Sequence, residues 1–168
     1  AHVAAKEHGL HLLVGAQFQV DSSDTSAPPF TLIALACNLH GYGNLCAFIT
    51  QLRRKSPKGQ YQLAQSAIKS RVFQDCIVLA APARNASQAH IQALADWLQQ
   101  QFAGQCWLAV HLERQLDDAV WLQRLRQASA ASGIPLVASG DVHMHVRSRK
   151  PLQDVLTAIR LRQPLADC

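Results

Sequence analysis

The feature that most constrains the fold is the run at residues 76–81, CIVLAA, in which every residue is apolar. A strand with water on one side alternates apolar and polar residues, whereas a parallel strand covered on both faces is apolar throughout. Two further apolar runs follow, at residues 106–112 and 134–138. The three runs predict parallel strands in a sheet that is covered on both faces.

Helical patterns separate these runs. Ser87 is placed to cap a first helix, Asp117 and Asp118 to open a second, and Gly133 to end it. The first helix carries apolar residues at intervals of three and four, namely Ile91, Leu94, Leu98 and Phe102. Strand and helix therefore alternate, which predicts an α/β protein with a parallel sheet or part of a (β/α) barrel.

The first third of the chain has a different order. Residues 10–20 and 30–36 are both strand-like, and no helix lies between them, which predicts an antiparallel hairpin. A helix is expected over residues 42–54. With 168 residues in total, one domain is the expectation.

Composition narrows the class of protein. Apolar residues make up 49% of the chain and charged residues 16%, which excludes a disordered tail. The net charge of +5 permits contact with nucleic acid or an acidic ligand without establishing either. The five cysteines form no CxxC pair, and we interpret them as reduced core thiols of a cytoplasmic protein. No membrane contact is expected, because no apolar run reaches the ~18 residues of a membrane helix.

Candidate site residues lie where the predicted strands end, since functional groups of α/β proteins gather at the carboxyl ends of strands. Asp141 and His143 follow the last strand, His111 follows the strand before it, and Gln17 lies on the first. Asp141 and His143 could ligate a divalent metal that assists the hydrolysis of phosphoesters. Alternatively they form a hydrogen bond with each other. Their spacing leaves both interpretations open.

Two basic clusters could contact phosphates or simply be solvated, and aromatic residues accompany neither of them, so stacking on single strands is not indicated. The candidate nucleic-acid contacts are Arg53, Arg54, Lys55, Arg147, Arg149 and Lys150.

A last helix is expected after Pro151. Its apolar residues have the spacing of one helix face, which predicts that this face is buried. They are Leu152, Val155, Leu156 and Ile159.

Several of these motifs together resemble a known family. They are VGAQF at residues 14–18, GYGNLCAFIT at 41–50, PKGQYQL at 57–63 and GDVHMHVRSRKPLQDVLTAIRLRQPL at 140–165. They resemble the polymerase-and-histidinol-phosphatase (PHP) domain of bacterial C-family DNA polymerase alpha subunits, and above all its error-prone, damage-inducible branch. The resemblance implies a distorted, TIM-like (β/α) barrel whose mouth binds divalent metals in members that keep every ligand.

Carried over residue by residue, the family's Asp-x-His metal ligands fall on Asp141 and His143, and its glutamate ligand falls on Gln17. The family's earlier His-x-His and Asp-His motifs do not occur in this sequence. The resemblance therefore implies that residues 1–168 are one partial PHP domain, an incomplete barrel of mostly parallel strands. Its metal site would be degenerate, and zinc or manganese, the cofactor of a complete site, is not expected in this fragment.

The resemblance also implies a parent protein. It would be an error-prone DNA-directed DNA polymerase, a nucleotidyltransferase of damage-induced replication and repair. This segment would be an inactive structural module whose partners are the rest of the polymerase chain and, through that chain, DNA. The alternatives are a metal-dependent phosphoesterase of the same superfamily and a nucleic-acid-binding module that uses the two basic clusters.

Overall fold

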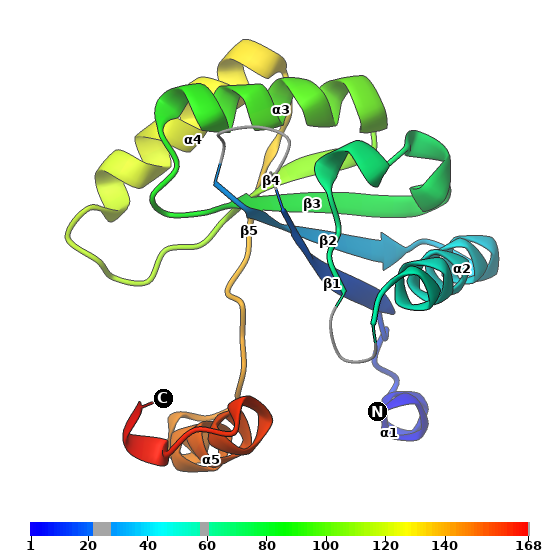
Figure 1. Ribbon diagram of the computed structural model, residues 1–168, viewed down its shortest axis with the longest axis vertical. Helices are drawn as coiled ribbons and strands as arrows, with labels where there is room; N and C mark the ends of the chain where they lie inside the picture. Colours follow the sequence, from blue (N-terminus) through cyan, green and yellow to red (C-terminus); the bar gives the residue numbers. More distant parts are fainter. Residues whose placement is uncertain (22–27, 58–60, 168) are drawn as a thin grey trace.

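A mixed five-stranded sheet forms the centre of the computed structural model, which describes residues 1–21, 28–57 and 61–167 (Figure 1). The strands lie in chain order: β1 (Gly15–Val20), β2 (Phe30–Ala36), β3 (Cys76–Pro82), β4 (Cys106–Val110) and β5 (Leu136–Ala138). β2 is antiparallel to both β1 and β3, whereas β3, β4 and β5 are parallel. This arrangement confirms the α/β class and the N-terminal hairpin.

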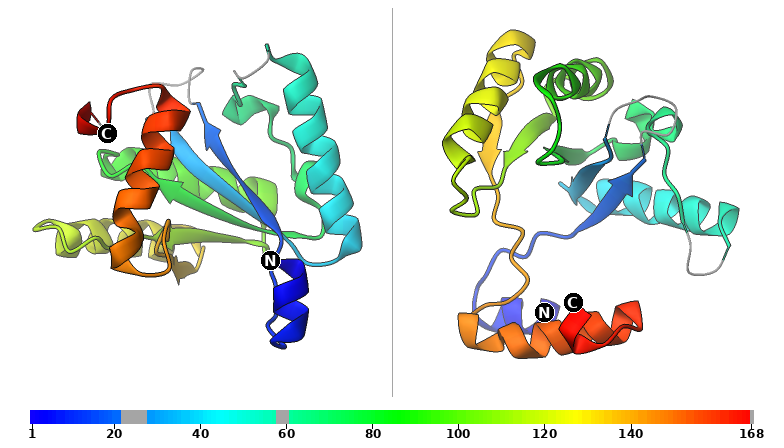
Figure 2. Two further views of the ribbon diagram at one scale, coloured as in Figure 1. Left: turned by 90° about the horizontal axis from the view of Figure 1, so that it is seen from below. Right: turned by 60° about the vertical axis from the view of Figure 1, so that its left-hand side comes forward.

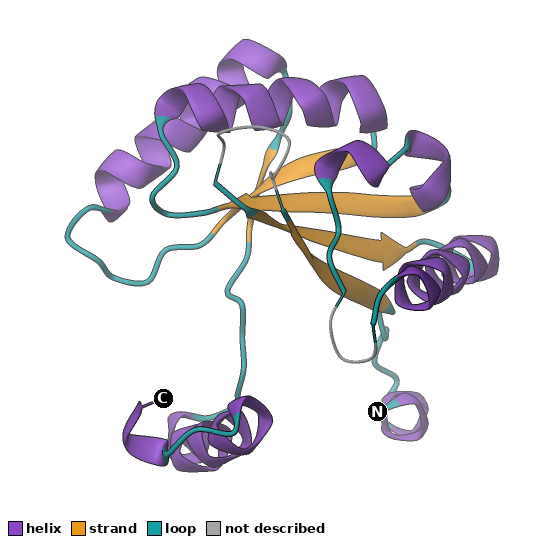
Figure 3. Cartoon of the chain, viewed as in Figure 1, coloured by secondary structure: helices purple, strands orange, loops and turns teal. Residues whose placement is uncertain are grey.

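Helices lie on both sides of the sheet, as Figure 3 shows, but only one side is closely packed. The α-helices are α1 (His2–Glu7), α2 (Leu39–Lys55), α3 (Gln88–Phe102), α4 (Asp118–Ser132) and α5 (Lys150–Leu161). The short 3-10 helices are η1 (Gln65–Ala67), η2 (Ser70–Phe73), η3 (Arg147–Arg149) and η4 (Leu165–Asp167). α2, α3 and α4 share one core with the sheet, whereas α1 and α5 stand away from its other side (Figure 1).

The core fills the space between the sheet and α2, α3 and α4. Fully buried residues of the sheet, such as Leu32, Val78 and Leu108, meet Ile91 of α3 and Leu125 of α4. Each strand contributes alternate side chains to this layer, as the pleat requires. β3 is apolar throughout because the side chains on both of its faces are at least partly buried.

The opposite face of the sheet is less covered. Ile33, Leu79 and Trp107 lie in one row across β2, β3 and β4 according to the strand register, and all three are half-buried. No helix packs closely on this row in the described part of the chain. The predicted parallel β-layer is therefore present, but it is tightly covered on one face only.

The helix boundaries follow the sequence signals closely. The Ser87 hydroxyl accepts a hydrogen bond from the His90 N–H at 3.3 Å, and Gly133 ends α4 with φ 76°. Asp117 and Asp118 do open α4, but they also bind Arg84, whose Nη2 lies 2.6 and 2.9 Å from their carboxylates. Arg84 follows β3, so these ion pairs connect the end of β3 to the start of α4.

The terminal helix differs from the prediction. α5 forms over Lys150–Leu161, yet its apolar face is exposed, so the predicted burial of this face is wrong for the described chain. The exposed fractions are 51% for Leu152, 42% for Val155, 53% for Leu156 and 68% for Ile159. The physical reason is the segment of residues 139–146, which contains no regular helix or strand and carries α5 away from the sheet (Figure 1).

The first strand also differs from the prediction, because it begins at Gly15 rather than at residue 10. The apolar residues before it, Leu10, Leu12, Leu13 and Val14, are exposed. None of the helices in residues 1–21, 28–57 and 61–167 is long and apolar enough to span a membrane.

The cysteines divide into two classes. Cys76 and Cys106 are buried, and burial raises the pKa of both thiols because the thiolate would lose its hydration. Cys37 and Cys46 are exposed, so the prediction of core thiols is wrong for these two. Cys168 lies outside the described residues.

Two glycines of α2 provide a matched test of packing. A Cβ at Gly41 would lie 2.1 Å from the Asp75 carbonyl oxygen, whereas a Cβ at Gly43 would meet nothing within 4 Å. We expect Gly41→Ala to lower the free energy of unfolding by about 1–3 kcal/mol. Gly43→Ala should raise it by about 0.5–1 kcal/mol, because alanine favours a helix interior. Urea denaturation measures both values, and equal effects would contradict the close contact at Gly41.

Thiol labelling tests the division of the cysteines. Under native conditions a thiol-alkylating reagent should modify Cys37 and Cys46 and spare Cys76 and Cys106, because only accessible thiolates react. Mass spectrometry of the labelled peptides gives the rate at each site. Labelling of Cys106 as fast as that of Cys46 in the folded chain would show that the β4 packing is wrong.

Candidate functional site

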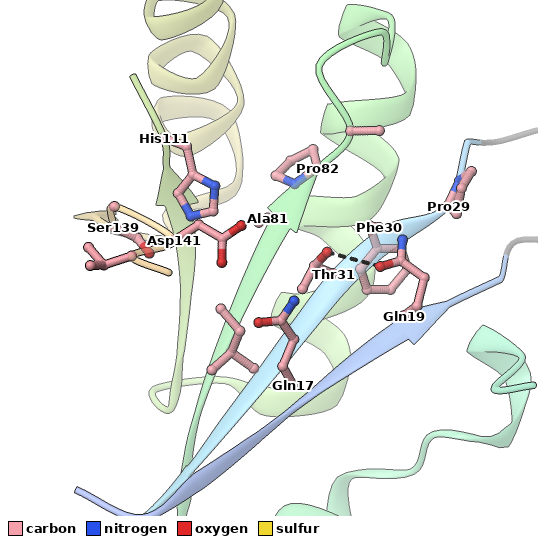
Figure 4. A pocket seen from close by; sticks show the side chains of 14 residues that line it. Gln17, Gln19, Pro29, Phe30, Thr31, Ala81, Pro82, His111, Ser139 and Asp141 are labelled. Atoms are coloured by element: carbon pink, nitrogen blue, oxygen red, sulfur yellow. Dashed lines mark hydrogen bonds between the residues drawn. The ribbon is translucent and has the colours of Figure 1, made fainter. Parts of the chain in front are cut away.

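A pocket of about 420 Å³ opens where β1, β3, β4 and β5 end and β2 begins (Figure 4). This edge forms because β2 alone runs against the other four strands. Its polar side chains come from the ends of several strands: Gln17 and Gln19 of β1, Thr31 of β2, His111 after β4, and Ser139 and Asp141 after β5. The expectation that strand ends bring the candidate residues together is confirmed for Gln17, His111 and Asp141.

Asp141 and His143 form a pair. Asp141 Oδ2 lies 3.2 Å from His143 Nε2, and the two side chains are 49% and 59% exposed. Asp141 has a φ of 43°, so the backbone turns there instead of continuing β5. Asp141 lines the pocket, whereas His143 is not among its lining residues. The hydrogen-bonded interpretation of this pair therefore matches the geometry.

Gln17 projects from β1 into the same pocket (Figure 4). Its neighbour Gln19 accepts a hydrogen bond from the Thr31 hydroxyl at 3.2 Å. Both side chains are neutral amides, so Asp141 is the one carboxylate among the residues that line the pocket. The pocket is consequently polar but weakly charged.

Sequence analysis placed His111 at a strand end without assigning it a role, whereas the structure places it in the pocket. Its Nε2 is buried, has no hydrogen-bond partner among the described residues, and its ring lies beside Asp141 in Figure 4. Its position at the end of a strand was the signal in the sequence, but the resemblance gave it no ligand role, because the acid and the histidine of this strand stand in the opposite order in the family. Glu113, two residues later, is exposed and does not line the pocket.

These donors do not complete a metal centre. Divalent metals in proteins take three or more side-chain ligands at enzyme sites, and a neutral amide is a weaker ligand than a carboxylate. Within residues 1–21, 28–57 and 61–167, no three His, Cys, Asp or Glu side chains form a set that could hold a metal ion. The residues present therefore do not fit the metal cluster of those family members that keep every ligand.

The two basic clusters are far apart. Arg53, Arg54 and Lys55 occupy the last turn of α2, which packs on the closely covered face of the sheet. The second cluster lies on η3 and at the start of α5, on the other side (Figure 2). All six cationic side chains are exposed, and Lys150 pairs with Asp154 at 2.6 Å. The structure does not bring the clusters together as one nucleic-acid surface.

Comparison with known proteins gives several relatives named error-prone DNA polymerase. No protein-family model matches the sequence. The chain is 43% identical over 166 residues to the error-prone DNA polymerase of Dechloromonas aromatica, a match that covers 96% of the chain and 15% of that protein. It is 39% identical over 176 residues to the error-prone DNA polymerase of Ralstonia nicotianae, covering 100% of the chain and 16% of that protein.

The error-prone DNA polymerase of Methylococcus capsulatus is 38% identical over 167 residues, with 99% of the chain and 15% of that protein covered. The chain thus spans about one sixth of the length of these relatives. Over nearly its whole length, the chain is therefore a homologue of one segment of the proteins named error-prone DNA polymerase.

Proposed function

We propose that this chain is a PHP-type structural module of an error-prone DNA-directed DNA polymerase and carries a degenerate metal site. The parent protein would be a cytoplasmic nucleotidyltransferase that copies DNA after damage. DNA and the rest of the polymerase chain would be its partners. Residues 1–168 would form one partial domain that positions neighbouring parts of the polymerase and performs no chemistry by itself.

The match to error-prone DNA polymerases over almost the whole chain carries this proposal. The pocket supports it further. It lies at the strand ends, where α/β proteins place their sites, yet Gln17 supplies a neutral amide and Asp141 engages His143. This position and this donor set are what we expect of a metal centre that has lost some of its ligands. The five strands would then be part of an incomplete TIM-like barrel.

Restoring a carboxylate tests whether the site is degenerate. Gln17→Glu should strengthen manganese binding roughly tenfold, because ligand charge sets much of the affinity for a divalent ion. Gln123→Glu adds the same charge on the exposed side of α4, outside the pocket, and serves as the control. Isothermal titration calorimetry measures both affinities. Equal gains in manganese affinity for the two variants would show that added negative charge alone strengthens binding, which would contradict the proposal.

Activity of the isolated chain separates the proposal from the phosphoesterase alternative. We expect no primer extension and no release of phosphate from a model phosphomonoester with manganese or zinc, because the described donors do not complete a metal site. Phosphate release that Asp141→Ala abolishes would support the phosphoesterase instead. Asp96→Ala is the matched control, since Asp96 is an exposed acid on α3, outside the pocket.

A further inference from the structure

In a packed helix the apolar face is buried and the polar face is exposed, whereas in α5 the apolar face is the more exposed of the two. Its four apolar residues, Leu152, Val155, Leu156 and Ile159, follow one another at i, i+3, i+4 and i+7 and are all exposed. The side of the helix that carries Gln153, Asp154 and Thr157 is only half-exposed. An amphipathic helix is stabilised mainly by burying its apolar face, so α5 lacks its main source of stability in this arrangement.

Most other exposed apolar side chains also lie outside the sheet and its three packed helices. They belong to the segments on either side of this unit, and they are Val3, Leu10, Leu12, Leu13, Val14, Val142, Val146, Leu161 and Leu165. Among the described residues of the two segments, 1–14 and 139–167, only Ala5 is a buried apolar residue, and none belongs to the core between the sheet and α2, α3 and α4. The unpartnered apolar surface is therefore concentrated where the chain leaves the sheet, and α5 presents its longest regular stripe.

The charged residues at the two ends of α5 indicate what kind of surface could bind its apolar stripe. Arg147 and Arg149 precede the helix, and Arg160 and Arg162 lie at its end, so both ends of the apolar stripe are basic. The only acid in the helix, Asp154, already pairs with Lys150. A complementary surface must therefore be apolar at its centre and carry carboxylates at both ends.

Two other occupants fit less well. Two copies of α5 packed antiparallel would place Arg147 and Arg149 of one against Arg160 and Arg162 of the other, so like charges would meet at both ends. DNA would satisfy the arginines, but it offers no apolar surface for Leu152, Leu156 and Ile159. An apolar groove in a protein, with acidic residues at its ends, buries the apolar stripe and also pairs with the arginines.

We propose that α5 is a docking helix whose apolar stripe inserts into an apolar groove with acidic ends, on the part of the polymerase polypeptide outside residues 1–168. This inference rests on the proposed function, because the chain matches only about one sixth of its relatives' length and the remainder supplies the groove. Residues 139–146 provide an extended connection that lets α5 reach a surface beyond its own sheet.

Leu156 and Leu161 form a matched pair for the test. Leu156 belongs to the stripe, whereas Leu161 projects about 140° away from Leu156 around the helix, given 3.6 residues per turn. Their exposed fractions are nearly equal, 53% and 50%. Substituting either by aspartate changes the same side chain in the same helix, but only Leu156→Asp places a charge in the proposed interface.

Limited trypsin digestion of the full-length protein gives the first measurement. Cleavage at Arg149, at the start of α5 and distant from both substituted positions, should be at least about tenfold slower in the full-length protein than in the 168-residue chain, because docking protects the helix from local unfolding and hence from the protease. Leu156→Asp should restore fast cleavage, and Leu161→Asp should not. Equal cleavage rates in the full-length protein and the chain would overturn the proposal.

Photo-cross-linking identifies the surface that α5 contacts in the full-length protein. A benzophenone amino acid at position 156 of the full-length protein should cross-link to an apolar segment with neighbouring Asp or Glu residues outside residues 1–168, and one at position 161 should not. Cross-links to a second copy or to the sheet of the same chain, or insertion of position 156 into phosphatidylserine vesicles, would each overturn the proposal. Primer extension by the same preparation tests the proposed function separately, so an active polymerase with an exposed α5 refutes only the docking helix.

Discussion

The structure depends on the contacts that Phe73 makes between elements far apart in the sequence. Its ring, carried by η2, lies 5.9 Å from that of Phe18 on β1, 5.1 Å from that of Phe48 on α2 and 6.0 Å from that of Phe102 on α3. Phe73 is 1% exposed, so nearly its whole surface is withdrawn from water. Edge-to-face and tilted aromatic pairs add to the burial of apolar area, and together they hold the edge of the sheet, α2 and α3 in one core.

This core fixes the strands, and the strands fix the pocket. Because β2 runs against the other four strands, the ends of β1, β3, β4 and β5 meet at one edge, where His111 and Asp141 come together with Gln17. Arg84 supports the same edge, since it joins the end of β3 to Asp117 and Asp118 of α4 and lies 5.3 Å above the ring of Trp121. The pocket is thus built on rigid elements even though its donors do not complete a metal centre. Within the described residues, α5 has no comparable support.

Sequence reasoning succeeded where a signal is local. The hairpin, the cap at Ser87 and the end of α4 at Gly133 each follow from a few adjacent residues, and all three are confirmed. It failed where the outcome depends on distant partners. The spacing of Leu152 and Leu156 indicates an apolar helix face but contains no information about what covers it. His111 is similar, because its unpartnered Nε2 results from burial that only the three-dimensional packing creates.

The central claim is that the sheet with α2, α3 and α4 is stable by itself, whereas α5 depends on a partner outside this chain. Hydrogen exchange of the 168-residue chain tests this claim most directly. Amides of β3, such as those of Val78 and Ala80, should exchange at least about a hundredfold more slowly than those of Leu156 and Ile159, because isolated helices of this length are marginal in water. Exchange in α5 that is as slow as in β3 would contradict the account.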